Sequence, residues 1–115
     1  MAYDVELADR VRDVLETLET GGVAEKRMFG GLAFLVGGHM AVSASSQGGL
    51  LLRCPPELTD ELVATDPERT GRFEMRGKQM TGWLRVDADA VAADEDLRRW
   101  VEIGVEHARS LPPKE

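Results

Sequence analysis

A pair of adjacent glycines, Gly37 and Gly38, lies between two short apolar runs and constrains the fold of this chain more than any other feature. Residues 32–36 precede the pair and residues 39–43 follow it, and both runs are rich in side chains that favour β-strands. A two-residue hairpin turn requires positive φ angles, which glycine adopts without steric cost. The stretch therefore predicts an antiparallel β-hairpin, and with it a fold built on a sheet.

A second glycine pair, Gly30 and Gly31, comes just before the first of these strands. Glycine here indicates a bulge, a turn, or a place where another stretch of backbone comes close. The alternative interpretation is a backbone surface left open for a ligand or partner. We expect residues 26–29 to lead directly into the strand at 32–36.

Three further short strands are predicted downstream of the hairpin. Residues 50–53 form a third apolar run, bounded by a glycine loop and by Pro55 and Pro56. Residues 72–75 and 80–86 flank a turn of Arg-Gly-Lys and predict a second hairpin. With the first hairpin, these runs make five strands.

Three helices complete the prediction. Residues 4–19 repeat apolar side chains at spacings of three and four, which indicates an amphipathic helix with Asp4 as its cap. A short helix follows the two prolines at 55 and 56. Asp94 is expected to cap a last helix that ends before Pro112. The inward face of this last helix is predicted to consist of Leu97, Trp100, Val101, Gly104, Val105 and Ala108.

The element order is therefore α-β-β-β-α-β-β-α, and it predicts a two-layer α+β domain with helices on one side of a five-stranded antiparallel sheet. The strand at 32–36 places apolar residues on both of its faces, which indicates a dimer or partner interface on the side away from the helices. We expect one domain over residues 1–111 and a disordered tail over 112–115.

Charge excludes some classes of function. The 115-residue chain has a formal net charge of −7 and an isoelectric point near 4.8, which disfavours an autonomous DNA-binding protein. Residues 69–85 are an exception, because they carry five basic residues against one acid. The start of the chain is acidic, and no run is long and apolar enough for a membrane span, so we expect a cytoplasmic protein without membrane contact.

The sequence contains no catalytic constellation. Cys54 is the only cysteine and is expected to be a buried or half-buried thiol rather than a nucleophile. His39 and His107 lack the spacing of a zinc site, and the dipole of the last helix is expected to favour the positive form of His107. We therefore expect neither an enzyme nor a bound cofactor or metal.

Two stretches point to a known family. Residues 27–31 read Arg-Met-Phe-Gly-Gly after an opening helix, and residues 73–86 combine an aromatic strand, a Gly-Lys turn and a second strand. In this the chain resembles the TfoX N-terminal domain of the TfoX/Sxy family, in a stand-alone form without the second helical domain of longer members. The resemblance implies a fold similar to secretion chaperones, a link to competence regulation, and no catalytic residues.

We interpret the chain as a non-catalytic regulatory or adaptor domain that binds an unidentified protein, with a homodimer as one candidate. Its contacts are expected on the exposed sheet face and around the basic residues. The alternative function is direct nucleic-acid binding through the basic hairpin of residues 69–85. The same basic residues can also be interpreted as charges that protect an exposed edge strand from pairing with other chains. The candidate contact residues are Arg27, Phe29, Arg72, Arg76, Lys78 and Arg85.

Overall fold

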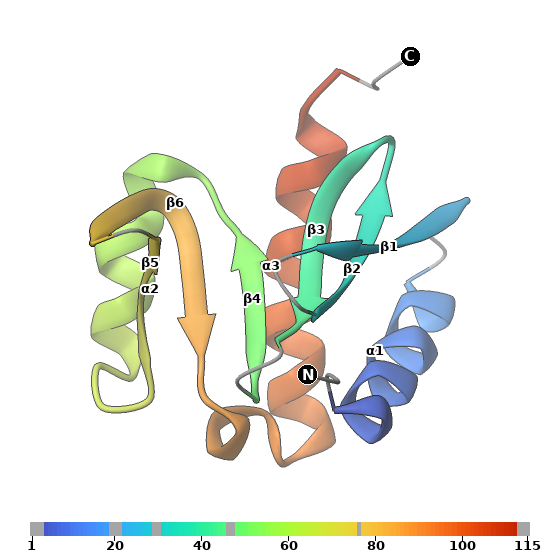
Figure 1. The fold of residues 1–115 in the computed structure, drawn as a ribbon, viewed down its shortest axis with the longest axis horizontal. Coiled ribbons are helices and arrows are strands. Elements are labelled where there is room, and N and C mark those ends of the chain that lie inside the picture. Colours follow the sequence, from blue (N-terminus) through green and yellow to red (C-terminus); the bar gives the residue numbers. More distant parts are fainter. Residues whose placement is uncertain (1–3, 19–21, 29–30, 46–47, 76, 113–115) are drawn as a thin grey trace.

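The fold is a single antiparallel sheet with helices packed on one side, as the computed structural model shows for residues 4–18, 22–28, 31–45, 48–75 and 77–112 (Figure 1). The helices of this described part are α1 (Val5–Thr17), α2 (Thr59–Thr65) and α3 (Asp94–Ser110), with single turns of 3-10 helix at Pro56–Leu58 and Ala88–Val91. Its strands are β1 (Val23–Met28), β2 (Gly31–Val36), β3 (His39–Ala44), β4 (Leu50–Arg53), β5 (Thr70–Met75) and β6 (Lys78–Val86). They lie in the order β1-β2-β3-β4-β6-β5.

The α+β class, the three helices and the antiparallel sheet are confirmed, whereas the expectation of five strands is wrong. Within the described residues the sheet has six strands, and the additional one is β1. Residues 26–28 do not run into the next strand but belong to β1, which folds back to pair antiparallel with β2. The order of elements therefore contains four strands, not three, between α1 and α2.

The exposed side chains of β1 explain why sequence periodicity did not predict this strand. Four consecutive residues of β1 are exposed, so the strand lacks the apolar alternation that marks a half-buried strand. Its Glu25 receives two hydrogen bonds from the Arg12 guanidinium of α1, at 2.7 and 2.8 Å. These bonds lower the pKa of Glu25 below its usual value. This ion pair fastens the edge strand to the helix layer.

The glycines of the first hairpin behave as predicted. Gly37 and Gly38 have φ angles of 61° and 84°, and the turn brings Val36 opposite His39. Gly31 marks a close approach of backbone, because a Cβ atom there would lie 2.2 Å from the carbonyl oxygen of Ala44. Gly30 lies outside the described residues.

Apolar side chains gather on both sides of the sheet, as expected from residues 32–36. The larger cluster joins α1, α3 and the strands through fully buried residues such as Val11, Phe34 and Trp100, and Leu62 of α2 packs against it. All three helices therefore lie on this side. The second cluster, on the opposite side, has Ala33, Met40 and Leu51 as its buried members.

The main helix, α3, lies across β3 and β4 behind the sheet in Figure 1. Its predicted inward residues are all buried. Gly104 is the point of closest approach, since a Cβ atom there would lie 2.4 Å from the carbonyl oxygen of Ala41. Ala41 lies where the pairing of β2 and β3 shifts register, which brings its carbonyl toward the helix.

One of the two expected helix caps is confirmed and the other is wrong. Asp4 caps α1 and accepts a hydrogen bond from the Leu7 amide at 3.1 Å. The prediction that Asp94 caps α3 is wrong, because Ala93 occupies that position without a side-chain cap. The Asp94 carboxylate instead pairs with Arg10 of α1 at 3.0 Å. A long-range ion pair thus replaces the local capping bond.

Candidate functional site

The candidate functional site is the sheet face away from the helices, called here the open face and defined by the second apolar cluster. Cross-strand pairs share a face, and one row of such pairs runs across five strands. The row consists of Lys26, Ala33, Ser43, Leu51 and Arg85. Its centre is closely packed, since Ala33, Ser43 and Leu51 are at most 4% exposed. Accessible surface therefore lies toward the two ends of the row.

The open face is bordered by half-buried apolar side chains and by cations. Met28, Leu35, Phe73 and Trp83 pack around the buried centre. Arg53 lies with its guanidinium 5.2 Å from the centroid of the Trp83 ring, a cation–π arrangement. The Nε atom of Arg53 is buried and has no hydrogen-bond partner in the described part of the chain. Arg53 and Lys26 were not among the predicted contact residues, because nothing in the local sequence indicates which strand neighbours they face.

The four predicted contact residues that the structure describes do not form one patch. Arg27 on β1 and Lys78 at the start of β6 are exposed, but these strands lie far apart in the sheet order. Arg72 stands opposite Leu84, on the helix side, whereas Arg85 stands opposite Leu51, on the open face. Phe29 and Arg76 lie outside the described residues. Arg72 and Arg85 therefore lie on opposite faces of the sheet and do not form one surface.

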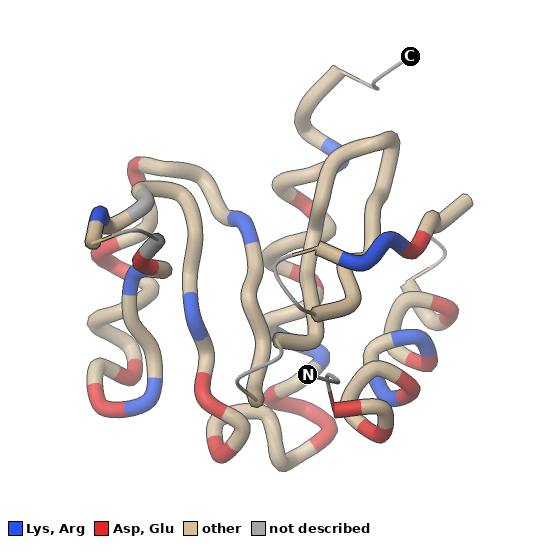
Figure 2. Tube along the Cα trace, in the orientation of Figure 1, with Lys and Arg blue, Asp and Glu red and all other residues tan. Residues whose placement is uncertain are grey.

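Carboxylates of the same chain pair with three basic residues of the stretch 69–85. Figure 2 marks the charged positions along the chain. Arg69 pairs with Asp66 at 2.7 Å, Arg72 pairs with Asp60 at the same distance, and Arg85 pairs with Asp87. Paired arginines present less positive potential to a phosphate or an acidic partner than their number in the sequence indicates. The strongest electrostatic feature of the sequence is thus largely compensated within the fold.

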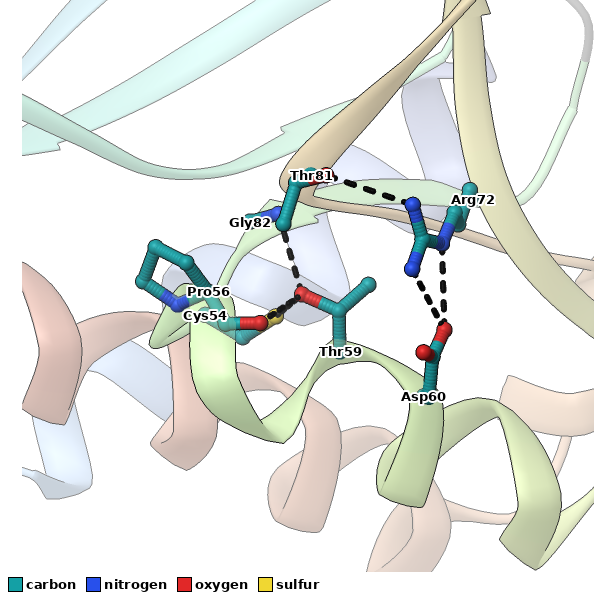
Figure 3. A network of polar contacts seen from close by, with 7 residues as sticks. All are labelled: Cys54, Pro56, Thr59, Asp60, Arg72, Thr81 and Gly82. Carbon is teal, nitrogen blue, oxygen red and sulfur yellow. Dashed lines mark hydrogen bonds and ion pairs between the residues drawn. The ribbon is translucent and has the colours of Figure 1, made fainter.

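A buried threonine joins α2 to the bend of β6 (Figure 3). The Thr59 hydroxyl donates to the Pro56 carbonyl at 2.9 Å and accepts from the Gly82 amide at 3.0 Å. Gly82 has a φ angle of 87° and lies where β6 shifts register against β5. Next to this contact, Arg72 bonds Asp60 and, at 3.2 Å, the Thr81 hydroxyl. Thr59 therefore fixes the shape of the strand that presents Trp83.

Replacing Thr59 by valine is expected to lower the free energy of unfolding by about 2 kcal/mol, because the shape is kept while the buried Gly82 amide loses its acceptor. Chemical denaturation measures the change. Thr65→Val serves as the control, since the exposed Thr65 hydroxyl bonds only the Leu62 carbonyl of its own helix. Equal losses in both variants would contradict a special role for Thr59.

The titratable groups most affected by the fold lie away from the centre of the open face. Cys54 is fully buried, as predicted, and burial raises the pKa of its thiol. The expectation that the helix dipole favours positive His107 is wrong. Burial lowers the pKa of His107, and the nearby positive charge of Arg53 lowers it further. His39 lies 2.6 Å from the Pro112 carbonyl oxygen, measured from its Nε2 atom.

Two searches of the described residues bear on other kinds of site. No group of three or more His, Cys, Asp or Glu side chains there is placed to hold a metal ion. None of the helices in the same part of the chain is both long and apolar enough to cross a membrane.

Fold and site together define a small two-layer α+β domain with one helix-covered and one open sheet face. The sequence model of the TfoX N-terminal domain matches residues 13–108, from α1 to near the end of α3, and the chain belongs to this family. The resemblance seen in residues 27–31 and 73–86 is thereby confirmed. Comparison with curated proteins gave no match.

Proposed function

We propose that this chain is a cytoplasmic, non-catalytic regulatory or adaptor domain that binds another protein through its open face. The observation that carries the proposal is an apolar cluster on the sheet side that no helix covers within the described residues. Membership of the TfoX N-terminal domain family supports a regulatory role, and transcription or competence control is the process we propose.

The border of the open face is the part that a partner would contact. Leu35 and Met28 are half-buried there, so their remaining apolar surface can be covered on binding. Lys26 is exposed beside them, and Arg53 lies over Trp83 on the same face, so cations border the apolar side chains. This arrangement favours a partner that combines apolar side chains with carboxylates. A second copy of the chain is the other candidate.

Direct nucleic-acid binding through residues 69–85 is the weaker alternative. Phosphate binding depends on cations that are free to approach the backbone of the nucleic acid. Arg69, Arg72 and Arg85 are each held by a carboxylate of the same chain. We therefore favour a protein partner.

The test is affinity capture from lysate, with and without nuclease, using two matched double variants. Ala24→Glu/Lys26→Glu changes two exposed residues of β1, at positions that pair with Leu35 and Ala33. Lys78→Glu/Gln79→Glu makes the same change in charge at the tip of the other hairpin. A nuclease-resistant partner lost only in the β1 variant is expected. Loss only in the hairpin variant, or capture that nuclease abolishes, would overturn the proposal.

A further inference from the structure

A groove lies between α1 and α3, on the side of the molecule opposite the open face. Its volume is about 280 Å³, and its apolar lining is Val14 of α1 with Leu97 of α3. Asp13 and Glu95 stand in its lining from the same two helices. A volume of this size lies just below the usual range of small-molecule pockets, which begins at about 300 Å³.

The two arginines in the groove are occupied in holding its walls together. The Arg10 guanidinium donates to the carbonyl oxygens of Val91 and Ala92 and to the Asp94 carboxylate, each at 3.0 Å. Arg98 donates to the Thr17 hydroxyl at 2.8 Å and to Glu102 at 2.9 Å. Neither cation is therefore available to attract an acidic ligand, although each fixes the spacing of the helices.

Two carboxylates in the lining of the groove, unlike its arginines and Asp94, are not occupied in ion pairs within the described residues. Asp13 and Glu95 are exposed, and neither takes part in an ion pair within the described residues. The helices around them are acidic, with nine carboxylates against five arginines in α1 and α3 (Figure 2). The groove thus combines an apolar lining with uncompensated negative charge.

We propose that this groove binds a basic segment of another protein, through one lysine or arginine. The aliphatic part of that side chain packs on the half-buried Val14, and its charged end reaches Asp13 and Glu95. Long basic side chains bury their stems in this way while their charge stays at the surface. The negative field of α1 and α3 favours the approach of such a segment and opposes the approach of nucleic acid.

A second copy of this chain fits the groove less well. Its own α1 and α3 carry nine carboxylates against five arginines, so these helices of two copies repel each other. The groove is also separate from the open face, since the helices cover one side of the sheet and the open face is the other. Its test can therefore fail while the proposed function holds, and the reverse is equally possible.

The experiment is a nuclear magnetic resonance titration of the whole chain with a synthetic peptide of alternating lysine and leucine. We expect the largest shifts at residues 13–17 and 94–98. The variant Asp13→Asn/Glu95→Gln is expected to weaken binding about fivefold, the effect of losing two partly exposed charge contacts. The control Glu6→Gln/Glu106→Gln removes the same charge from exposed positions of the same helices and is expected to change binding less than about twofold.

Three results would overturn the proposal. Equal weakening in both variants would mean that only the overall charge matters. Shifts centred on the open face would place the basic segment elsewhere. Sedimentation that shows a dimer in the wild type and a monomer in Asp13→Asn/Glu95→Gln would assign the groove to a second copy.

Discussion

The variant Gly104→Ala is expected to lower the free energy of unfolding by about 2 to 4 kcal/mol. The added Cβ atom would lie 2.4 Å from the Ala41 carbonyl oxygen and 2.9 Å from a methyl carbon of Val42. The first of these neighbours is backbone, so α3 must move away from β3 to make room. That movement would loosen contacts along the whole inward face of α3. Chemical denaturation of both proteins measures the difference.

The sign of this effect distinguishes packing from helix propensity. At an exposed helical position, replacing glycine by alanine stabilises a helix by about 1 kcal/mol. A stability gain in Gly104→Ala would therefore show that α3 is not seated on β3 as described. Glu106→Ala is the control for α3, because Glu106 is exposed, and a change within about 0.5 kcal/mol is expected.

Truncation of Trp100 to alanine is expected to cost about 3 to 5 kcal/mol, which is a large part of the stability of a domain of this size. Trp100 is 1% exposed and is among the largest fully buried side chains of the core. Its removal leaves a cavity between α3 and the sheet that the neighbouring side chains fill only in part. Thermal and chemical denaturation, with circular dichroism to check the fold, measure the loss.

Trp100→Phe is the informative companion. The indole Nε1 of Trp100 is buried and has no hydrogen-bond partner among the described residues. An unpaired buried donor costs about 1 to 3 kcal/mol, and phenylalanine has no such donor. This gain offsets much of the free energy lost with the smaller side chain, so we expect a net cost of about 1 kcal/mol. A cost as large as that of the alanine variant would contradict the unpaired state of the indole.

The predictions that the structure confirms concern features determined by a few residues close together in the sequence. The turn at Gly37 and Gly38, the strand Leu50–Arg53, the cap at Asp4 and the buried face of α3 all follow from local sterics or from periodicity. The family resemblance is of the same kind, because it depends on short stretches read directly from the chain. Such features do not depend on what the rest of the chain does.

The candidate site was predicted less well, because a site depends on which residues become neighbours. The basic residues of the second hairpin are conspicuous in the sequence, yet Asp60, from α2, compensates Arg72, and Arg85 points to the opposite face. The reverse holds for Arg53, which is inconspicuous in the sequence and stacks over Trp83 in the fold. Positive charge on the open face could not be assigned before the strand register was known.

By itself the sequence determined the α+β class, the first hairpin, the helices and the family, since backbone sterics and apolar spacing act within single elements. Only the tertiary structure decided that β1 is a sixth strand, because its exposed side chains carry no periodic signal; it pairs with β2, and an ion pair links it to Arg12 of α1. It also decided that Asp94 bonds Arg10 rather than capping α3, and that Gly104 lies on Ala41. These contacts join residues far apart in the chain, so the competition between a local and a distant partner is settled only when the layers pack together.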